Sequence, residues 1–170
     1  YSITFTDESG GVANTTSVMI EPDDEGLSGG NGGTISNVTV PTSTAGLEGT
    51  VELNVTDQFG NLLPNETLSI DSTDGLDGLV AGTTVTANES GVATFSFNET
   101  VADSYTVTLA DDTGVVRGTI SVVVTSDSAG VSGGSGGEIV VTTSTVGAGQ
   151  GQVNVTATDQ YGNPVVGEPI

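Results

Sequence analysis

Carboxylates are the side chains in this sequence that could carry acid–base or metal chemistry, because the chain has 22 Asp and Glu but no His and no Cys. Without His and Cys, catalytic triads, cysteine nucleophiles and most transition-metal sites are excluded. Paired carboxylates can hydrolyse glycosidic bonds. Here they are spread over turns, and aromatic residues that could hold a sugar make up 4% of the chain. The sequence therefore predicts no catalytic residues and no enzyme.

One acidic loop has the composition of a calcium site. Asp71, Asp74 and Asp77 lie in a loop that contains glycine, and oxygen-only ligands suit a hard cation. Their spacing differs from the alternating spacing of well-known calcium loops, so solvated acidic turns are the alternative. Calcium is the one cofactor that the sequence suggests. The acidic residues 23–25 are a second candidate cluster.

Asn-x-Ser/Thr sequons are more frequent than the composition predicts. The chain has seven of them, whereas roughly two or three are expected by chance. Asn54 lies on the polar face of an alternating pattern, and Asn154 occupies the matching position further along. The excess predicts N-glycosylation and an extracellular location; the alternative is that Asn is simply a good polar residue for strands and turns. The sites are Asn14, Asn37, Asn54, Asn65, Asn88, Asn98 and Asn154.

The charge of the chain is strongly one-sided. Arg117 is its one basic residue, and the net charge is -21. Contact with nucleic acid or with an anionic membrane is disfavoured, because both carry like charge. Near-absence of Lys is typical of proteins that work in molar salt, where the Debye length is about 3 Å. The composition indicates an extreme halophile of archaeal type, with an acidic bacterial surface protein as the alternative.

The two ends of the chain repeat each other. Residues 1–33 match residues 105–137 without a gap, and residues 57–61 (DQFGN) return as residues 159–163 (DQYGN). A period of about one hundred residues is that of a whole small domain. The sequence thus predicts the end of one unit (1–22), a Gly-rich linker (23–33), a complete unit (34–126), a second Gly-rich linker (127–137) and the start of a third unit (138–170). An array of this kind is suited to spanning a distance and to presenting a large surface, and it does not indicate an enzyme.

Apolar residues alternate with polar ones through the complete unit, which predicts strands and no helix. Seven short strands separated by turn residues are typical of a two-sheet sandwich. We expect these strands at residues 35–40, 50–56, 66–71, 79–86, 92–97, 104–110 and 115–125. The expected core comprises Val51, Leu53, Val55, Leu68, Ile70, Ala93, Phe95, Phe97, Tyr105, Val107, Leu109, Ile120, Val122 and Val124.

Three segments carry a family resemblance: VTDQFGNLLPNETLSI, TANESGVATFSF and ADSYTVTL. They are similar to the bacterial immunoglobulin-like domain of the invasin and intimin type, and the resemblance extends over nearly the whole chain. It departs from the usual motifs at Leu62 and Leu63, which replace a Pro-Val pair, and at Ser104, which replaces Gly. The resemblance implies an all-β fold of tandem immunoglobulin-like β-sandwich domains joined by Gly-rich linkers. It also implies a surface stalk or spacer without chemistry of its own.

Two local features suggest how the units are held. Tyr105 follows Asp103 and Ser104 in the manner of a tyrosine corner, in which the phenol bonds to nearby main chain; core filling is the alternative. Both linkers have the composition of flexible coil, yet each keeps an apolar residue, Leu27 or Val131, at the same place. We expect this residue to dock on a neighbouring unit and limit bending.

These patterns predict a structural repeat segment of an extracellular, glycosylated, halophilic surface stalk, sheath or filament. Its expected partners are neighbouring copies of itself, end to end or side by side, and N-linked glycans. Nucleic acid and direct membrane contact are not expected. The incomplete end units either continue along the same chain or complete each other by strand exchange. Alternatives are an accessory array on a secreted enzyme, and an adhesin or viral spike that binds through loop aromatics such as Phe59 and Tyr161.

Overall fold

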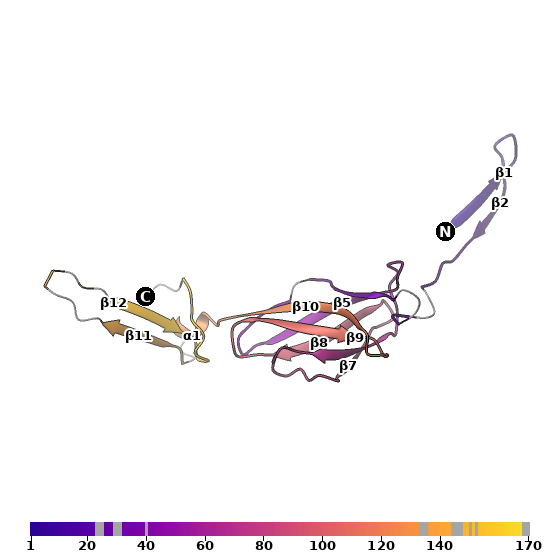
Figure 1. Ribbon diagram of the computed structural model, residues 1–170. Coiled ribbons are helices and arrows are strands. Elements are labelled where there is room, and N and C mark those ends of the chain that lie inside the picture. Colours follow the sequence, from indigo (N-terminus) through magenta and orange to yellow (C-terminus); the bar gives the residue numbers. More distant parts are fainter. Residues whose placement is uncertain are drawn as a thin grey trace.

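A computed structural model describes residues 1–22, 26–28, 32–39, 41–132, 136–143, 148–149, 151 and 153–167 of the chain. Two-stranded hairpins lie at the two ends of the molecule, and a larger β-sandwich lies between them (Figure 1). The first hairpin pairs β1 (Ser2–Thr6) with β2 (Val12–Ser17), and the last pairs β11 (Glu138–Thr143) with β12 (Val153–Thr158). Both hairpins are antiparallel.

The sandwich, which we call the middle unit, consists of two facing sheets. Their strands are β3 (Thr34–Asn37), β4 (Thr42–Thr44), β5 (Glu48–Thr56), β6 (Thr67–Ser72), β7 (Thr84–Thr86), β8 (Val92–Asn98), β9 (Ser104–Ala110) and β10 (Val116–Thr125). One sheet has the order β4-β10-β9-β6-β7 and the other β3-β5-β8. Neighbouring strands are antiparallel except β4 and β10, which are parallel. The expected immunoglobulin-like sandwich fold is confirmed.

Strict alternation along the strands builds the core between the two sheets. In β5, Val51, Leu53 and Val55 are fully buried, and the residues between them face outward. Successive side chains of a strand point to opposite faces, so this period of two places every second residue inside. Each buried aliphatic or aromatic side chain contributes about 1.5–3 kcal/mol. All the expected core residues lie in the cluster, with Tyr105 half-buried at its edge.

The structure corrects the predicted elements in three places. It adds β4, which has no apolar alternation and forms through its parallel pairing with β10. The strand predicted at residues 79–86 is shorter, because Leu79 packs into the core from a loop and only Thr84–Thr86 pairs with β6. One helical turn, α1 (Ala129–Ser132), lies in the second linker, where no helix was expected.

Five hairpin turns share one geometry. In each, an Asp or Asn side chain accepts hydrogen bonds from the N–H groups two and four residues later, at 2.8–3.1 Å. A glycine with positive φ completes the turn, as at Gly60 with φ 85°. In the turn at residues 57–61, Asn61 also donates its side-chain amide to Asp57. The five turns begin at Asp7, Asp57, Asn88, Asp111 and Asp159.

The first linker packs on the middle unit. Leu27 is fully buried and belongs to the core cluster of the sandwich, which confirms that it docks on a neighbouring unit. Its N–H donates to the Glu66 carboxylate at 3.1 Å, and its carbonyl accepts from Gly33 at 2.9 Å. Gly32 and Gly33 are buried too, with Gly32 against the Arg117 guanidinium. In the second linker, Val131 is half-buried.

The two end hairpins expose apolar side chains. Every residue of β1 and β2 is exposed, including Ile3 at 45% and Phe5 at 55%. A two-stranded hairpin is too small to bury its own apolar face. Continuation along the chain and strand exchange therefore both remain predictions for these faces. Within the ranges that the structure describes, no helix has the length and apolar character needed to span a bilayer.

Candidate functional site: the junction between two units

The turn at residues 159–163, which we call the docking loop, touches the middle unit through Asn163. The Asn163 side chain donates Nδ2 to the Thr100 carbonyl at 2.7 Å, and its Oδ1 accepts the Ala102 N–H at 2.8 Å. Only 6% of Asn163 is exposed. Both partners are main-chain groups, so this one amide recognises the shape of the 100–102 segment and not its side chains.

Tyr161 packs on a glycine of the middle unit. A Cβ added to Gly46 would overlap the Tyr161 phenol, so any larger residue at this position would force the phenol to move. Gly46 has φ +80°, a conformation that also favours glycine. Gly46, Thr100 and Ala102 together form what we call the receiving face of the middle unit. Gly46 gives this face a main-chain surface without a side chain, and Thr100 and Ala102 give it main-chain groups that hydrogen-bond to Asn163.

The second linker is tied to the same loop. The Asp127 N–H donates to Asp159 Oδ2 at 3.0 Å, and Gln160 Nε2 donates to Asp127 Oδ2 at 2.8 Å. Burial raises the pKa of Asp159, but hydrogen bonds from Asn163, Asp127 and Tyr161 outweigh it and lower the pKa below its ordinary value. The carboxylate that organises the junction is therefore ionised at neutral pH.

The receiving face is held in shape by a buried carboxylate and by the tyrosine corner. Glu99 accepts N–H groups of Asp77, Thr100 and Val101 at 3.0, 2.7 and 2.9 Å. Burial raises the pKa of Glu99, but these three hydrogen bonds outweigh that effect and bring the pKa below its ordinary value. The Tyr105 hydroxyl donates to the Val101 carbonyl at 2.9 Å, which confirms the predicted tyrosine corner. Two independent anchors thus fix the segment that Asn163 binds.

Arg117 forms an ion pair inside the middle unit. Its Nε donates to Asp111 Oδ2 at 2.7 Å, and the Asp111 side chain is fully buried. Burial raises the pKa of Asp111, but hydrogen bonds from Thr113, Val115 and Arg117 outweigh it and bring the pKa to about 2. The pair stabilises the β9–β10 hairpin and lies outside the junction.

The predicted glycosylation sites are spread over the molecule. Asn54 is half-buried in β5, and the side chain of Asn37 lies outside the described residues. Five sites are exposed, as acceptors of a glycan must be: Asn14, Asn65, Asn88, Asn98 and Asn154. Glycosylation of any of these residues stays a prediction.

The acidic loop of the middle unit does not assemble a metal site in this structure. Asp71, Asp74 and Asp77 are all exposed, and within the described part of the chain no three acidic side chains are grouped to hold a metal ion. The loop is held instead by Leu76, which is 2% exposed, and by the hydrogen bond from Asp77 to Glu99. The second acidic cluster, residues 23–25, lies outside the described residues. Calcium binding stays a prediction, which melting with and without chelator would check.

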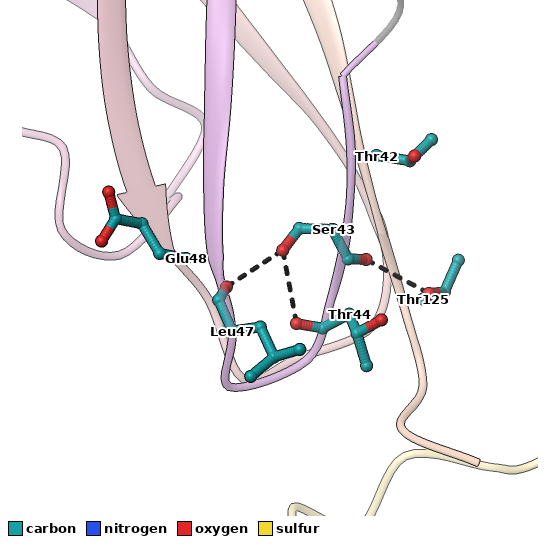
Figure 2. Close-up of a pocket in the computed structure, with 6 residues that line it drawn as sticks. All are labelled: Thr42, Ser43, Thr44, Leu47, Glu48 and Thr125. Carbon is teal, nitrogen blue, oxygen red and sulfur yellow. Dashed lines mark hydrogen bonds between the residues drawn. The ribbon is translucent and has the colours of Figure 1, made fainter. Parts of the chain in front are cut away.

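An open hollow of about 410 Å³ lies beside β4, where the parallel pairing with β10 ends. Figure 2 shows that two of its hydroxyls donate to main-chain carbonyls: Ser43 to the Leu47 carbonyl at 3.0 Å, and Thr125 to the Ser43 carbonyl at 3.1 Å. Among the described residues that line the hollow, Glu48 is the one that carries a charge. These contacts stabilise the corner between β4 and β5.

From the sequence, the residues of the docking loop were interpreted as part of the repeat and, at Tyr161, as a binding aromatic, and not as a contact between units. The loops at residues 7–11 and 111–115 form the same turn with an Asp, a Gly and a Ser or Thr hydroxyl that donates to the Asp. The loops at residues 57–61 and 159–163 share three further positions: a Gln, an aromatic residue and an Asn. Residues that repeat beyond the needs of a turn indicate a contact, and here the contact is the junction.

The chain is similar in fold to a bacterial protein of known structure. A crystal structure of invasin, described as a bacterial integrin-binding protein, superposes with a TM-score of 0.56 at 20% identity and covers 79% of this chain. The chain spans 28% of the length of that protein. Domains 4–9 of the surface layer protein SbsC align at 20% identity with a TM-score of 0.35, over 78% of this chain and 21% of that one. Neither a protein-family model nor a curated protein sequence matches the chain.

Proposed function

We propose that this chain is a structural repeat segment of an extracellular surface stalk, sheath or filament, in which consecutive sandwiches are held at a fixed orientation. The junction is the observation that carries this proposal. A flexible string of domains needs no contact between units, whereas here Asn163 and Tyr161 seat on the preceding unit. The same junction also joins the linker to the docking loop through Asp127. Two contacts at one junction resist bending, which suits a protein that holds something away from a surface.

Labelling of native cells tests the surface location. Antibodies raised against the middle unit should bind intact cells and decorate projections or a layer in electron micrographs. Labelling that appears only after the cells are broken would reject the proposal. An antibody against a cytoplasmic protein of the same cells is the control for breakage.

Salt and glycans belong to the same proposal. The net charge of -21 supports a protein of the haloarchaeal type, since molar salt screens the repulsion between its carboxylates. The midpoint of thermal unfolding should rise steeply as KCl is raised from dilute buffer to molar concentrations. Five exposed sequons support N-glycosylation, which mass spectrometry of peptides from the native protein checks. Nucleic acid and direct membrane contact are excluded from the proposal by the like charge.

An adhesin or viral spike that binds a partner directly is the second candidate function. Phe59 favours it, because a loop aromatic that is 75% exposed is unusual on a stalk and common at contact surfaces. This candidate predicts that Phe59→Ala abolishes attachment to a partner surface without changing the shape of the chain.

A further inference from the structure

The middle unit carries a second copy of the docking loop. Residues 57–61 have the sequence DQFGN, against DQYGN at residues 159–163. The two loops have the same internal geometry: the N–H of Phe59 donates to Asp57 at 2.8 Å, and that of Tyr161 to Asp159 at 2.9 Å. Each Asn also donates its side-chain amide to the Asp at 2.9 Å. The loop at residues 57–61 is therefore already shaped for docking.

The surroundings of the two loops differ. Phe59 is 75% exposed, whereas Tyr161 is 43% exposed. Asn61 is exposed, whereas Asn163 is 6% exposed because Thr100 and Ala102 cover it. The exposed Phe59 ring keeps apolar surface in contact with water, which is unfavourable, and the Asn61 amide keeps hydrogen-bonding capacity beyond its one bond to Asp57. Equivalent residues are covered at the other junction, so the occupant of this surface can be inferred from that junction.

We infer that residues 57–61 dock on the receiving face of a further sandwich of this same kind, the unit whose last two strands are β1 and β2. This inference rests on the proposed function and names the partner of one surface. Tyr1 matches Tyr105 in the repeat, so β1 and β2 correspond to β9 and β10. The two linkers match residue for residue in length, with Asp23 at the place of Asp127. A unit ending in β1–β2 would thus present its receiving face at the distance that the known junction requires.

The chemistry of the receiving face recurs along the sequence. The segment TSTAG, which ends in Gly46, returns as TSTVG, which ends in Gly147, so the last unit also keeps the small residue on which an aromatic ring can pack. The contact uses main-chain groups, glycine and an aromatic ring in place of ion pairs. Such a contact persists in molar salt, where ion pairs between exposed side chains are screened. Because the units are tethered, a small contact area is sufficient.

A chain with two complete middle units tests the inference. Repeating residues 34–137 once, in tandem, places two intact copies of the middle unit on either side of the native linker 127–137. The docking loop of the second copy then follows the receiving face of the first copy, while the docking loop of the first copy stays as it is now. The chain has no Trp, so Phe59→Trp in one copy at a time gives a single reporter. The two labelled chains differ only in which copy carries the indole.

The indole of the second copy should be quenched by acrylamide about twofold less than that of the first, in line with the exposures of Tyr161 and Phe59, 43% and 75%. Asn61→Ala in an unlabelled chain provides a second measurement, which decides the matter if the larger indole does not enter the face. By small-angle scattering, this change in the second copy should broaden the distribution of maximum dimensions. The same change in the first copy should leave the distribution unaltered.

Equal quenching in both copies, together with no effect of Asn61→Ala in either copy, would overturn the inference. The native junction serves as the internal reference, because Asn163→Ala in the same chain must broaden the distribution if the proposed function is right. A rigid native junction beside a loose new one would reject the inference alone. A native junction that Asn163→Ala leaves unaffected would reject the proposed function.

Discussion

The side-chain amide of Asn163 lies 2.7 Å from the carbonyl oxygen of Thr100, so a side chain of one unit completes the main-chain hydrogen bonding of the unit before it. The Ala102 N–H donates to the same side chain at 2.8 Å. The segment 100–102 is in turn fixed by Glu99, which accepts the Thr100 N–H, and by Tyr105, which donates to the Val101 carbonyl. The junction is therefore built on main-chain groups that the fold of the middle unit already holds in place.

Replacing Asn163 by alanine should loosen the junction without unfolding either unit. The change removes two hydrogen bonds between units, each worth about 1 kcal/mol net. Amide exchange at Ala102, followed by NMR, should become roughly tenfold or more faster, since about 1.4 kcal/mol corresponds to a factor of ten. Asn61→Ala is the matched control, because it removes the same internal bond to the turn Asp while Asn61 is exposed. Unchanged exchange at Ala102 in the Asn163 variant would contradict the assignment of the junction.

Gly46→Ala should separate the two units by steric overlap. Both Gly46 and Gly60 have positive φ, of +80° and +85°, so an alanine at either position costs about 1 kcal/mol of backbone strain. The added Cβ meets the Tyr161 phenol at Gly46, whereas at Gly60 it meets open space. Small-angle scattering should thus show greater bending for Gly46→Ala than for Gly60→Ala at similar losses of melting temperature. Equal bending in the two variants would mean that Tyr161 does not need this close approach.

Leu27→Ala should destabilise the middle unit although Leu27 lies in a Gly-rich linker. Leu27 is fully buried in the core cluster, so its truncation should cost about 3 kcal/mol of unfolding free energy. Leu47→Ala is the control, since Leu47 is 61% exposed and its truncation should cost little. Denaturant titration in molar salt measures both. A cost below that of Leu47→Ala would show that the linker is a passive tether.

Acid should remove the contribution of Asp111 between about pH 4 and pH 2. Its pKa falls from 3.8 to about 2 in the folded protein, so the ionised form is favoured by folding. A lowered carboxyl pKa stabilises the fold above the unfolded value and loses that stabilisation as pH falls through the folded value, here about 2 kcal/mol. Asp111→Asn should therefore lower stability at neutral pH and flatten the acid limb of the stability curve.

The acid experiment needs a control for the overall charge, because protonation also relieves repulsion among the other carboxylates. Asp112→Asn removes the same charge from an exposed neighbouring position and should leave the acid limb unchanged. Measurements at constant molar salt keep the long-range repulsion screened. An acid limb that is equally steep in Asp111→Asn and in the parent chain would reject the role of the Arg117–Asp111 pair.

The strands and the core of the middle unit could be predicted because their signals are local. Val51, Leu53 and Val55 alternate with polar residues, and such a period of two specifies a strand with one apolar face. The turns could also be predicted, since an Asp or Asn followed at a fixed spacing by Gly is typical of a tight turn. Tyr105 was placed through its motif, and the structure shows its hydroxyl on Val101.

The parts that the sequence left open depend on residues far apart in the chain. Strand β4 exists through its pairing with Thr125 and its neighbours in β10, and no local pattern in Thr42–Thr44 requires it. The docking of Leu27 and Asn163 likewise depends on surfaces that other strands create. The likeness of the units follows from the sequence alone, because residues 1–33 and residues 105–137 match each other position by position. How one unit meets the next was decided by the tertiary structure, since Gly46, Thr100 and Ala102 form a single face only after the two sheets have closed.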